Sequence, residues 1–222
     1  MVFHGCSNLT SVTISINFGI SELFAYEARG RLTSVTIPEG VTIIGAESFR
    51  SCSGLTSVTI PESVTTIADW ALVDCINLKK VRIINGLTSI GENAFRTCSA
   101  LTSVTIPESV ASIGNWAFLN CNNLKSIIFE GNAPSLTSLA FLEISESAKI
   151  YVKPNSKGFG KIFGGLPVVL KKEKPKISAT SKSAAQFSFS FKSKSGSTYI
   201  IEASHDLKAV SYTHLRAHET EA

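Results

Sequence analysis

The sequence predicts a repeat solenoid with one short parallel β-strand in each 23-residue unit, followed by a C-terminal β-hairpin. Two observations carry this prediction. Rows of similar residues recur at a spacing of 23 along the first two thirds of the chain, and apolar and polar residues alternate within each unit. A fixed period of roughly 20 to 50 residues is typical of solenoids, in which each unit buries its apolar face against the next.

The cysteines mark the period most clearly. Cys52, Cys75, Cys98 and Cys121 lie 23 residues apart, and Cys6 lies two periods before Cys52. Residues of one row in a stacked solenoid are about 4.8 Å apart with parallel Cα–Cβ vectors. That geometry disfavours a disulfide, which needs the two Cβ atoms to face each other. We therefore predict a buried structural row of free thiols.

Each unit is expected to begin with a strand and to return along an irregular or short helical back. Alternation of apolar and polar residues predicts strands over 55–60, 78–83 and 101–106, with the valine and isoleucine side chains inward. Pro38, Pro61 and Pro107 follow predicted strands, where a missing N–H disrupts the fewest ladder bonds. An irregular back is expected in the second unit, which departs from the pattern.

One unit carries a family resemblance. From Leu101 to Cys121 the sequence is Leu-x-x-Val-x-Ile-Pro-x-x-Val-x-x-Ile-Gly-x-x-Ala-Phe-x-x-Cys, which resembles the BspA-like, or Treponema-type, leucine-rich repeat. The resemblance covers residues 1–153 and implies a leucine-rich-repeat solenoid. It also implies a secreted bacterial surface protein that binds host or neighbouring-cell components without catalysis, and hence an extracellular or cell-surface location.

The remaining segments follow from changes in pattern. Residues 1–153 form an N-terminally truncated solenoid in this interpretation, its signal peptide lost with the missing start. Residues 154–170 are predicted to be a C-terminal cap, 171–183 a Lys/Ser-rich linker, and 184–209 a partial β-sandwich module that contains the hairpin. Residues 210–222 resemble translated adaptor sequence and are expected to be a foreign, disordered tail.

The lysines between Lys149 and Lys194 allow two interpretations. This stretch holds eleven lysines and one acid, Glu173, within a formal net charge of +4 for the chain. Such a run is either a polyanion-binding segment or a solvated linker, and the neighbouring proline and serines favour the linker.

No pattern in the sequence predicts catalysis. A phosphate-binding loop, a dinucleotide fingerprint, a zinc-protease motif and a nucleophile elbow are all missing. We expect no enzyme activity, no cofactor and no metal site. No apolar run reaches the roughly 20 residues of a membrane span, so none is expected in this fragment.

The outward strand positions are the candidate ligand site. Stacking is expected to place them on a concave sheet face, where rows of hydroxyls are interrupted by a basic band. The candidate residues are Thr56, Ser57, Thr59, Lys79, Lys80, Arg82, Thr102, Ser103, Thr105 and Lys125. Threonine and serine also suit exposed strand positions in general, so a purely structural role for the hydroxyls is the alternative.

Two functions remain as hypotheses. The first is a non-catalytic adhesion or protein-binding module, monomeric, that binds a protein or glycan on a host or neighbouring cell through the concave face, with no nucleic-acid partner. The alternative is a structural stalk that displays another domain, possibly catalytic, of a longer polypeptide.

Overall fold

The computed structural model describes residues 10–13, 30–136 and 139–171, and the backbone of 178–183, 186–192, 198–204 and 218–219. The chain divides into two compact units, Met1–Lys171 and Lys172–Ala222. The predictions for Cys6, for the back of the second repeat and for the tail other than residues 218–219 lie outside the described residues.

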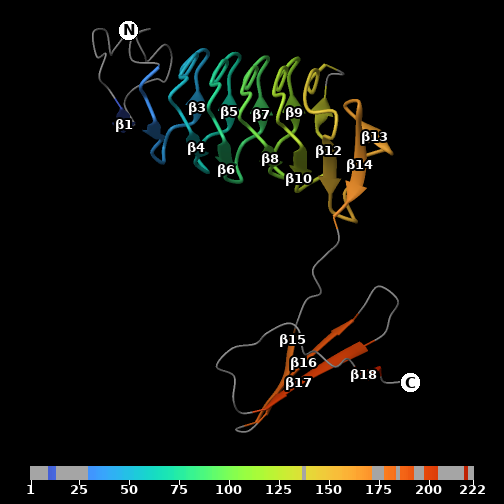
Figure 1. Ribbon diagram of the computed structural model, residues 1–222. Helices are drawn as coiled ribbons and strands as arrows, with labels where there is room; N and C mark the ends of the chain where they lie inside the picture. The colour runs from blue at the N-terminus through green and yellow to red at the C-terminus, as the bar shows by residue number, and fades with distance from the viewer. Residues whose placement is uncertain are drawn as a thin grey trace. The chain divides into compact units, whose positions relative to one another are not determined.

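The first unit is a parallel β-solenoid, as predicted (Figure 1). One side of each coil carries a long strand. Most consecutive long strands pair in parallel with a 23-residue offset, for example Ser57 with Lys80 and Ser103 with Ser126. The strands at 80–83 and 103–106 are not paired with each other, and the last pair has an offset of 18, as in Ile150 with Val168. The burial of these strands alternates, which confirms the predicted inward valines and isoleucines. The long strands are β1 (Ser11–Thr13), β2 (Ser34–Thr36), β4 (Ser57–Ile60), β6 (Lys80–Ile83), β8 (Ser103–Ile106), β10 (Ser126–Phe129), β12 (Lys149–Val152) and β14 (Leu166–Leu170).

The back of the coil contains a second, narrower sheet, and none of the described residues is helical. Its strands also pair in parallel, and in four of the five an isoleucine points into the core, as Ile67 and Ile90 do. In the last strand Leu136 takes this place. Exposed threonines reinforce this side: the Thr88 hydroxyl donates to the Thr65 carbonyl over 2.9 Å. The back strands are β3 (Ile43–Ile44), β5 (Thr66–Ile67), β7 (Ser89–Ile90), β9 (Ser112–Ile113) and β11 (Ser135–Leu136).

A third set of hydrogen bonds joins the coils at the corner after each back strand. The N–H of Leu72 donates to the Ala94 carbonyl over 2.8 Å, and the N–H of Phe95 donates to Ala117 over 2.8 Å. This corner needs left-handed residues at two places in each unit, although none of them is glycine. They are Glu47, Trp70, Asn93 and Trp116 in one row, and Ser51, Asp74, Thr97, Asn120 and Glu143 in the other.

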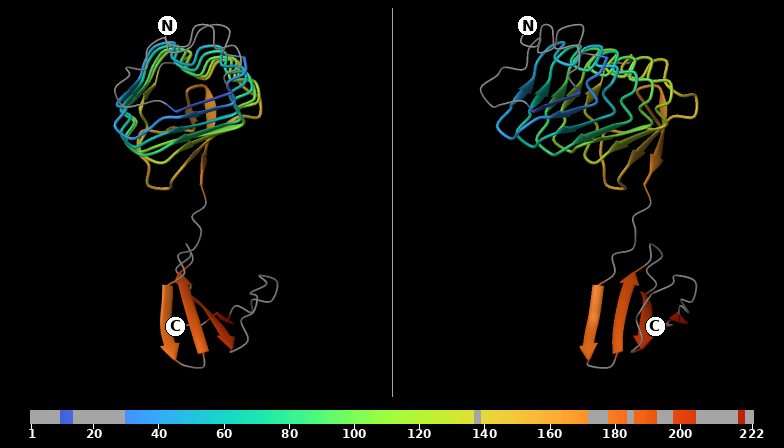
Figure 2. Two further views of the ribbon diagram at one scale, coloured as in Figure 1. Left: turned by 90° about the vertical axis from the view of Figure 1, so that its left-hand side faces the viewer. Right: turned by 60° about the vertical axis from the view of Figure 1, so that its left-hand side comes forward.

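Stacked rows of apolar side chains fill the solenoid, and the coils nearly superpose when viewed along its axis (Figure 2). The phenyl rings of Phe95 and Phe118 stack with centroids 5.2 Å apart, and those of Phe118 and Phe141 stack at 5.4 Å. Phe159 and Phe163 pack on Phe129 beside β13 (Ile162–Phe163), which pairs antiparallel with β14. The segment predicted as a cap thus adds β14 to the long-strand row and aromatic rings to the core.

The second unit is a small antiparallel sheet with the order β15-β16-β17-β18. β16 (Gln186–Lys192) and β17 (Thr198–Ser204) form the predicted hairpin. β15 (Ser178–Ser183) lies within the stretch expected to be a linker, and β18 (His218–Glu219) lies within the expected tail.

The four described cysteines form no disulfide, are fully buried and lie in one row, as predicted. Three of the thiols donate to the carbonyl of a core residue in the preceding coil: Cys75 to Phe49 over 3.1 Å, Cys98 to Leu72 over 3.4 Å, and Cys121 to Phe95 over 3.1 Å. Burial raises the pKa of Cys121 from 9.0 to about 12. Burial also raises the pKa of Cys75 and Cys98, so these three thiols are neutral at physiological pH.

The row of long strands is interrupted between β6 and β8, which belong to different sheets. Where two long strands pair over four residues, the N–H of the residue that follows the second strand donates to the carbonyl of the last residue of the first. Ile84 donates to Ile60 in this way, and Glu130 donates to Ile106, both over 3.0 Å. Pro107 occupies this place after β8 and has no N–H. Pro61 occupies the equivalent place after β4, and β4 pairs with β2 through one residue pair only. The prolines therefore weaken the ladder to the preceding coil.

Removing the Cys121 thiol should make stability less sensitive to alkaline pH. Because the folded pKa is raised, the thiol's contribution is complete below about pH 9 and is lost as the pH rises toward about 12. Over that window the unfolding free energy of the wild type should fall more steeply than that of Cys121→Ala, by about 1.4 kcal/mol per pH unit at most. Denaturant unfolding at several pH values measures this difference, and parallel curves for the two proteins would contradict it.

Pro107→Ile, which copies the residue at position 84, should restore the missing ladder bond. The new hydrogen bond contributes about 0.5–1.5 kcal/mol, while the more flexible unfolded chain costs about 0.4–1 kcal/mol. The net change in unfolding free energy should therefore stay within about 1 kcal/mol, and hydrogen exchange is the sharper measurement. The amide of residue 107 should be protected. Exchange as fast as in an exposed loop would refute the explanation, and Pro154→Ile, outside the ladder, is the control.

Candidate ligand-binding face

The outward side chains of β4, β6, β8, β10 and β12, together with the residue before each strand, form what we call the long-strand face. All ten predicted site residues lie on it and are exposed: Thr56, Ser57, Thr59, Lys79, Lys80, Arg82, Thr102, Ser103, Thr105 and Lys125. The local reason is the strand alternation, since the inward neighbours are apolar and all buried except Ile83, which is partly buried. The parallel register then places equivalent residues of successive units side by side.

Two further residues on this face were missed by the sequence analysis. The register pairs Ser126 with Lys149 and Ile128 with Tyr151, so β12 continues the face with an exposed cation and a partly exposed aromatic ring. The signal that predicts them is the 23-residue step from Ile127 to Ile150. This unit lacks the leucine and cysteine of the other repeats, which hides its phase.

The positive charge of the face is not neutralised by the protein. Residues 1–148 contain eight Lys or Arg and twelve Asp or Glu, a net charge of −4, yet four of the eight cations lie on this face. Within the described part of the chain, neither these four (Lys79, Lys80, Arg82 and Lys125) nor Lys149 forms an ion pair. The outward positions from β4 to β12 include no acid. The face is therefore a local positive surface on a net acidic region.

The hydroxyls of the face differ from hydroxyls elsewhere in the solenoid. On other sides of the coil, Thr65, Ser63 and Ser109 donate to a carbonyl of the preceding coil. Over the described residues, the six serine and threonine side chains of the face that lie in or directly before β4 and β8 form no hydrogen bond, although Thr33, in the same row before β2, donates to the Thr10 carbonyl over 3.0 Å. Their hydroxyls remain available to both donors and acceptors of a ligand.

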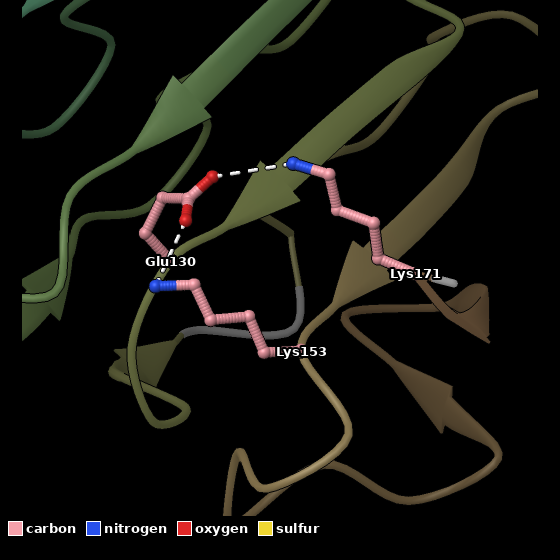
Figure 3. A network of polar contacts seen from close by, with 3 residues as sticks. All are labelled: Glu130, Lys153 and Lys171. Atoms are coloured by element: carbon pink, nitrogen blue, oxygen red, sulfur yellow. Dashed lines mark hydrogen bonds and ion pairs between the residues drawn. The ribbon is translucent and has the colours of Figure 1, made fainter. Parts of the chain in front are cut away.

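A second polar cluster lies at the end of β10, beside a hollow of about 630 Å³ lined by Glu108, Glu130 and Lys153. The Glu130 carboxylate accepts from the Lys153 ammonium over 2.9 Å and from Lys171 over 3.5 Å (Figure 3). The hydrogen bond from Lys153, with a smaller contribution from Lys171, lowers the pKa of Glu130 below its usual 4.5. These two lysines are thus engaged within the protein, unlike the cations of the face.

The described residues contain no group of three or more His, Cys, Asp or Glu side chains placed to hold a metal ion. The same part of the chain has no helix with the length and apolar character needed to cross a membrane.

Glu130→Gln should remove both ion pairs at a small cost. The side chains of Glu130, Lys153 and Lys171 are between a third and a half exposed, so the unfolding free energy should fall by less than about 1 kcal/mol at neutral pH. Because the folded pKa is lowered, this contribution is present above about pH 4.5 and is lost at lower pH. Wild type and variant should therefore converge as the pH falls well below 4.5. Glu108→Gln is the unpaired control, and a gap that persists in acid would contradict the assignment.

Comparison with known proteins agrees with the fold. Residues 20–148 match the BspA type leucine rich repeat region, in six copies. A leucine-rich repeat protein from Bacteroides ovatus is similar over 74% of this chain and 43% of its own, with 24% identity and a TM-score of 0.57. The leucine-rich repeat protein of Treponema pallidum is similar over 57% of this chain and 60% of its own, with 26% identity and a TM-score of 0.52.

The chain spans less than two thirds of either of these structures. No curated protein shows significant similarity to it. The family match covers more than half of the chain and agrees with the repeat period, the parallel ladders and the stacked core described above. The chain therefore belongs to the family of proteins with BspA-type leucine-rich repeats.

Proposed function

We propose that this protein is a non-catalytic adhesion module of a secreted bacterial surface protein, and that it binds its partner through the long-strand face. The observation that carries the proposal is the set of five exposed, unpaired cations on a surface without acids. Four of the five lie within residues 1–148, which carry a net charge of −4. Family membership supports a binding role, since leucine-rich repeats of this type form extended surfaces that suit protein binding.

The physical basis of binding is modest attraction at many places. Each exposed cation contributes less than about 1 kcal/mol with an opposite charge. Charges in the strands and free hydroxyls between them provide many such contacts over one surface. Binding of this kind weakens with salt, because charges farther apart than about 8–10 Å are screened at physiological ionic strength.

The experiment compares two variants that each lose two positive charges. Lys79→Thr/Lys80→Ser gives β6 the residues of its neighbours, and Lys157→Ser/Lys161→Ser removes two exposed lysines that lie off the face. Adhesion of the full chain to immobilised extracellular-matrix protein and to neighbouring bacteria is measured at low and moderate salt. We expect the first variant to adhere several-fold more weakly and to lose most of the salt dependence, with an unchanged melting temperature.

The control variant should adhere like the wild type. Equal adhesion by all three proteins would reject the face as the adhesive surface. The alternative function, a stalk that displays another domain of a longer polypeptide, would then be favoured.

A further inference from the structure

The cations of the long-strand face lie in rows that cross the strands. Lys80, Ser103, Ser126 and Lys149 are successive members of one row, since each lies 23 residues after the last. Lys79, Thr102 and Lys125 form the neighbouring row. Where the strands pair, each step is about 4.8 Å, so the two steps from β8 to β12 span about 10 Å. The cations of β6 lie on the neighbouring strand beyond the interruption, and the free hydroxyls of Thr102 and Ser103 lie between the cations.

The direction of the rows selects the direction of a ligand. A ligand that follows one strand meets more than one unpaired cation only along β6, whereas an extended ligand that crosses the strands meets Lys79 or Lys80, then Lys125, then Lys149. At the ends of these strands the charges are mixed. Glu108 is exposed just beyond β8, whereas Glu130 beyond β10 is paired with both Lys153 and Lys171.

We propose that the track from β6 to β12 binds an anionic polysaccharide, with sulfate or uronic carboxylate groups on Lys79, Lys80, Lys125 and Lys149. The proposal rests on the proposed function, because it names the ligand class of the same face. Sugar hydroxyls between the charged groups meet the free hydroxyls of Thr102 and Ser103, which both donate and accept. The partly exposed ring of Tyr151 lies beside the track on β12 and offers an apolar surface with a polar tip.

An acidic peptide fits this face less well. Extended peptides gain affinity mainly by pairing their backbone with an exposed sheet edge. The long-strand face presents side chains only, because the backbone groups of its strands point along the sheet toward neighbouring coils. A polysaccharide needs no backbone pairing and carries both charges and hydroxyls at each repeat.

The test uses the full chain and four immobilised probes: heparin, hyaluronan, neutral dextran and poly-glutamate. We expect salt-sensitive binding to heparin, weaker binding to hyaluronan and none to dextran. Lys125→Thr/Lys149→Ser should lower the affinity for heparin by about tenfold, as expected for the loss of two exposed charge pairs. The charge-preserving Lys125→Arg/Lys149→Arg should bind like the wild type and shows that the fold is kept.

Lys157→Ser/Lys161→Ser is the matched control, because it removes the same charge from exposed lysines off the track. Equal weakening by control and track variants would show attraction by bulk positive charge and would overturn the proposal. Unchanged heparin binding in the track variant would overturn it as well. So would binding of poly-glutamate that is as tight as that of heparin and is weakened equally by Lys125→Thr/Lys149→Ser.

These failures are distinguishable from failure of the proposed function. If Lys79→Thr/Lys80→Ser still weakens adhesion to matrix protein while heparin binding fails, the face remains adhesive and only the ligand class is wrong. If neither adhesion nor heparin binding responds to any face variant, both proposals fall.

Discussion

Backbone hydrogen bonds between consecutive coils constrain the rest of the solenoid. They occur at three places around each coil: from Lys79 to Thr56 in the long strands, from Thr88 to Thr65 in the back strands, and from Leu72 to Ala94 at the corner. An inserted or deleted residue in one unit would displace at least one of these ladders and leave buried polar groups unpaired, at about 1–3 kcal/mol each. The 23-residue period is therefore required by hydrogen bonding at three places as well as by the core.

The equal length of the coils makes each row of side chains a separate local environment. Phenylalanine rings stack on phenylalanine rings, and each thiol lies under a carbonyl of the preceding coil. Cysteine suits that place because it is small and apolar and yet supplies a weak donor. Within the described part of the chain, no buried side-chain nitrogen or oxygen lacks a partner. The same residue types therefore recur every 23 residues because each row has the same packing environment in every coil.

The sequence was sufficient to predict the coil, its long strands, the buried thiols and the hairpin, because these follow from periodicity and alternation. It did not predict the back strands, which are two residues long, too short for alternation to be seen. The left-handed corners were also missed, since tryptophan, glutamate and threonine occupy places where glycine is the usual signal. The interruption between β6 and β8 arises because Pro107 has no N–H to donate to the preceding coil. Predicting it requires the strand register, which the sequence alone does not give.

The candidate site could be picked out from the sequence because its charged residues stand at positions where the fold does not require a charge. Lys80 and Arg82 lie two residues apart on the same side of β6, at a separation of about 7 Å, so their repulsion in water is about 0.6 kcal/mol. Neutral Ser and Thr fill the same positions on β4 and β8, and the strands pack equally well there. The fold therefore gains nothing from the charges and loses little by them. Residues of this kind carry the most information about what a repeat surface meets in solution, whereas the inward rows report only on packing.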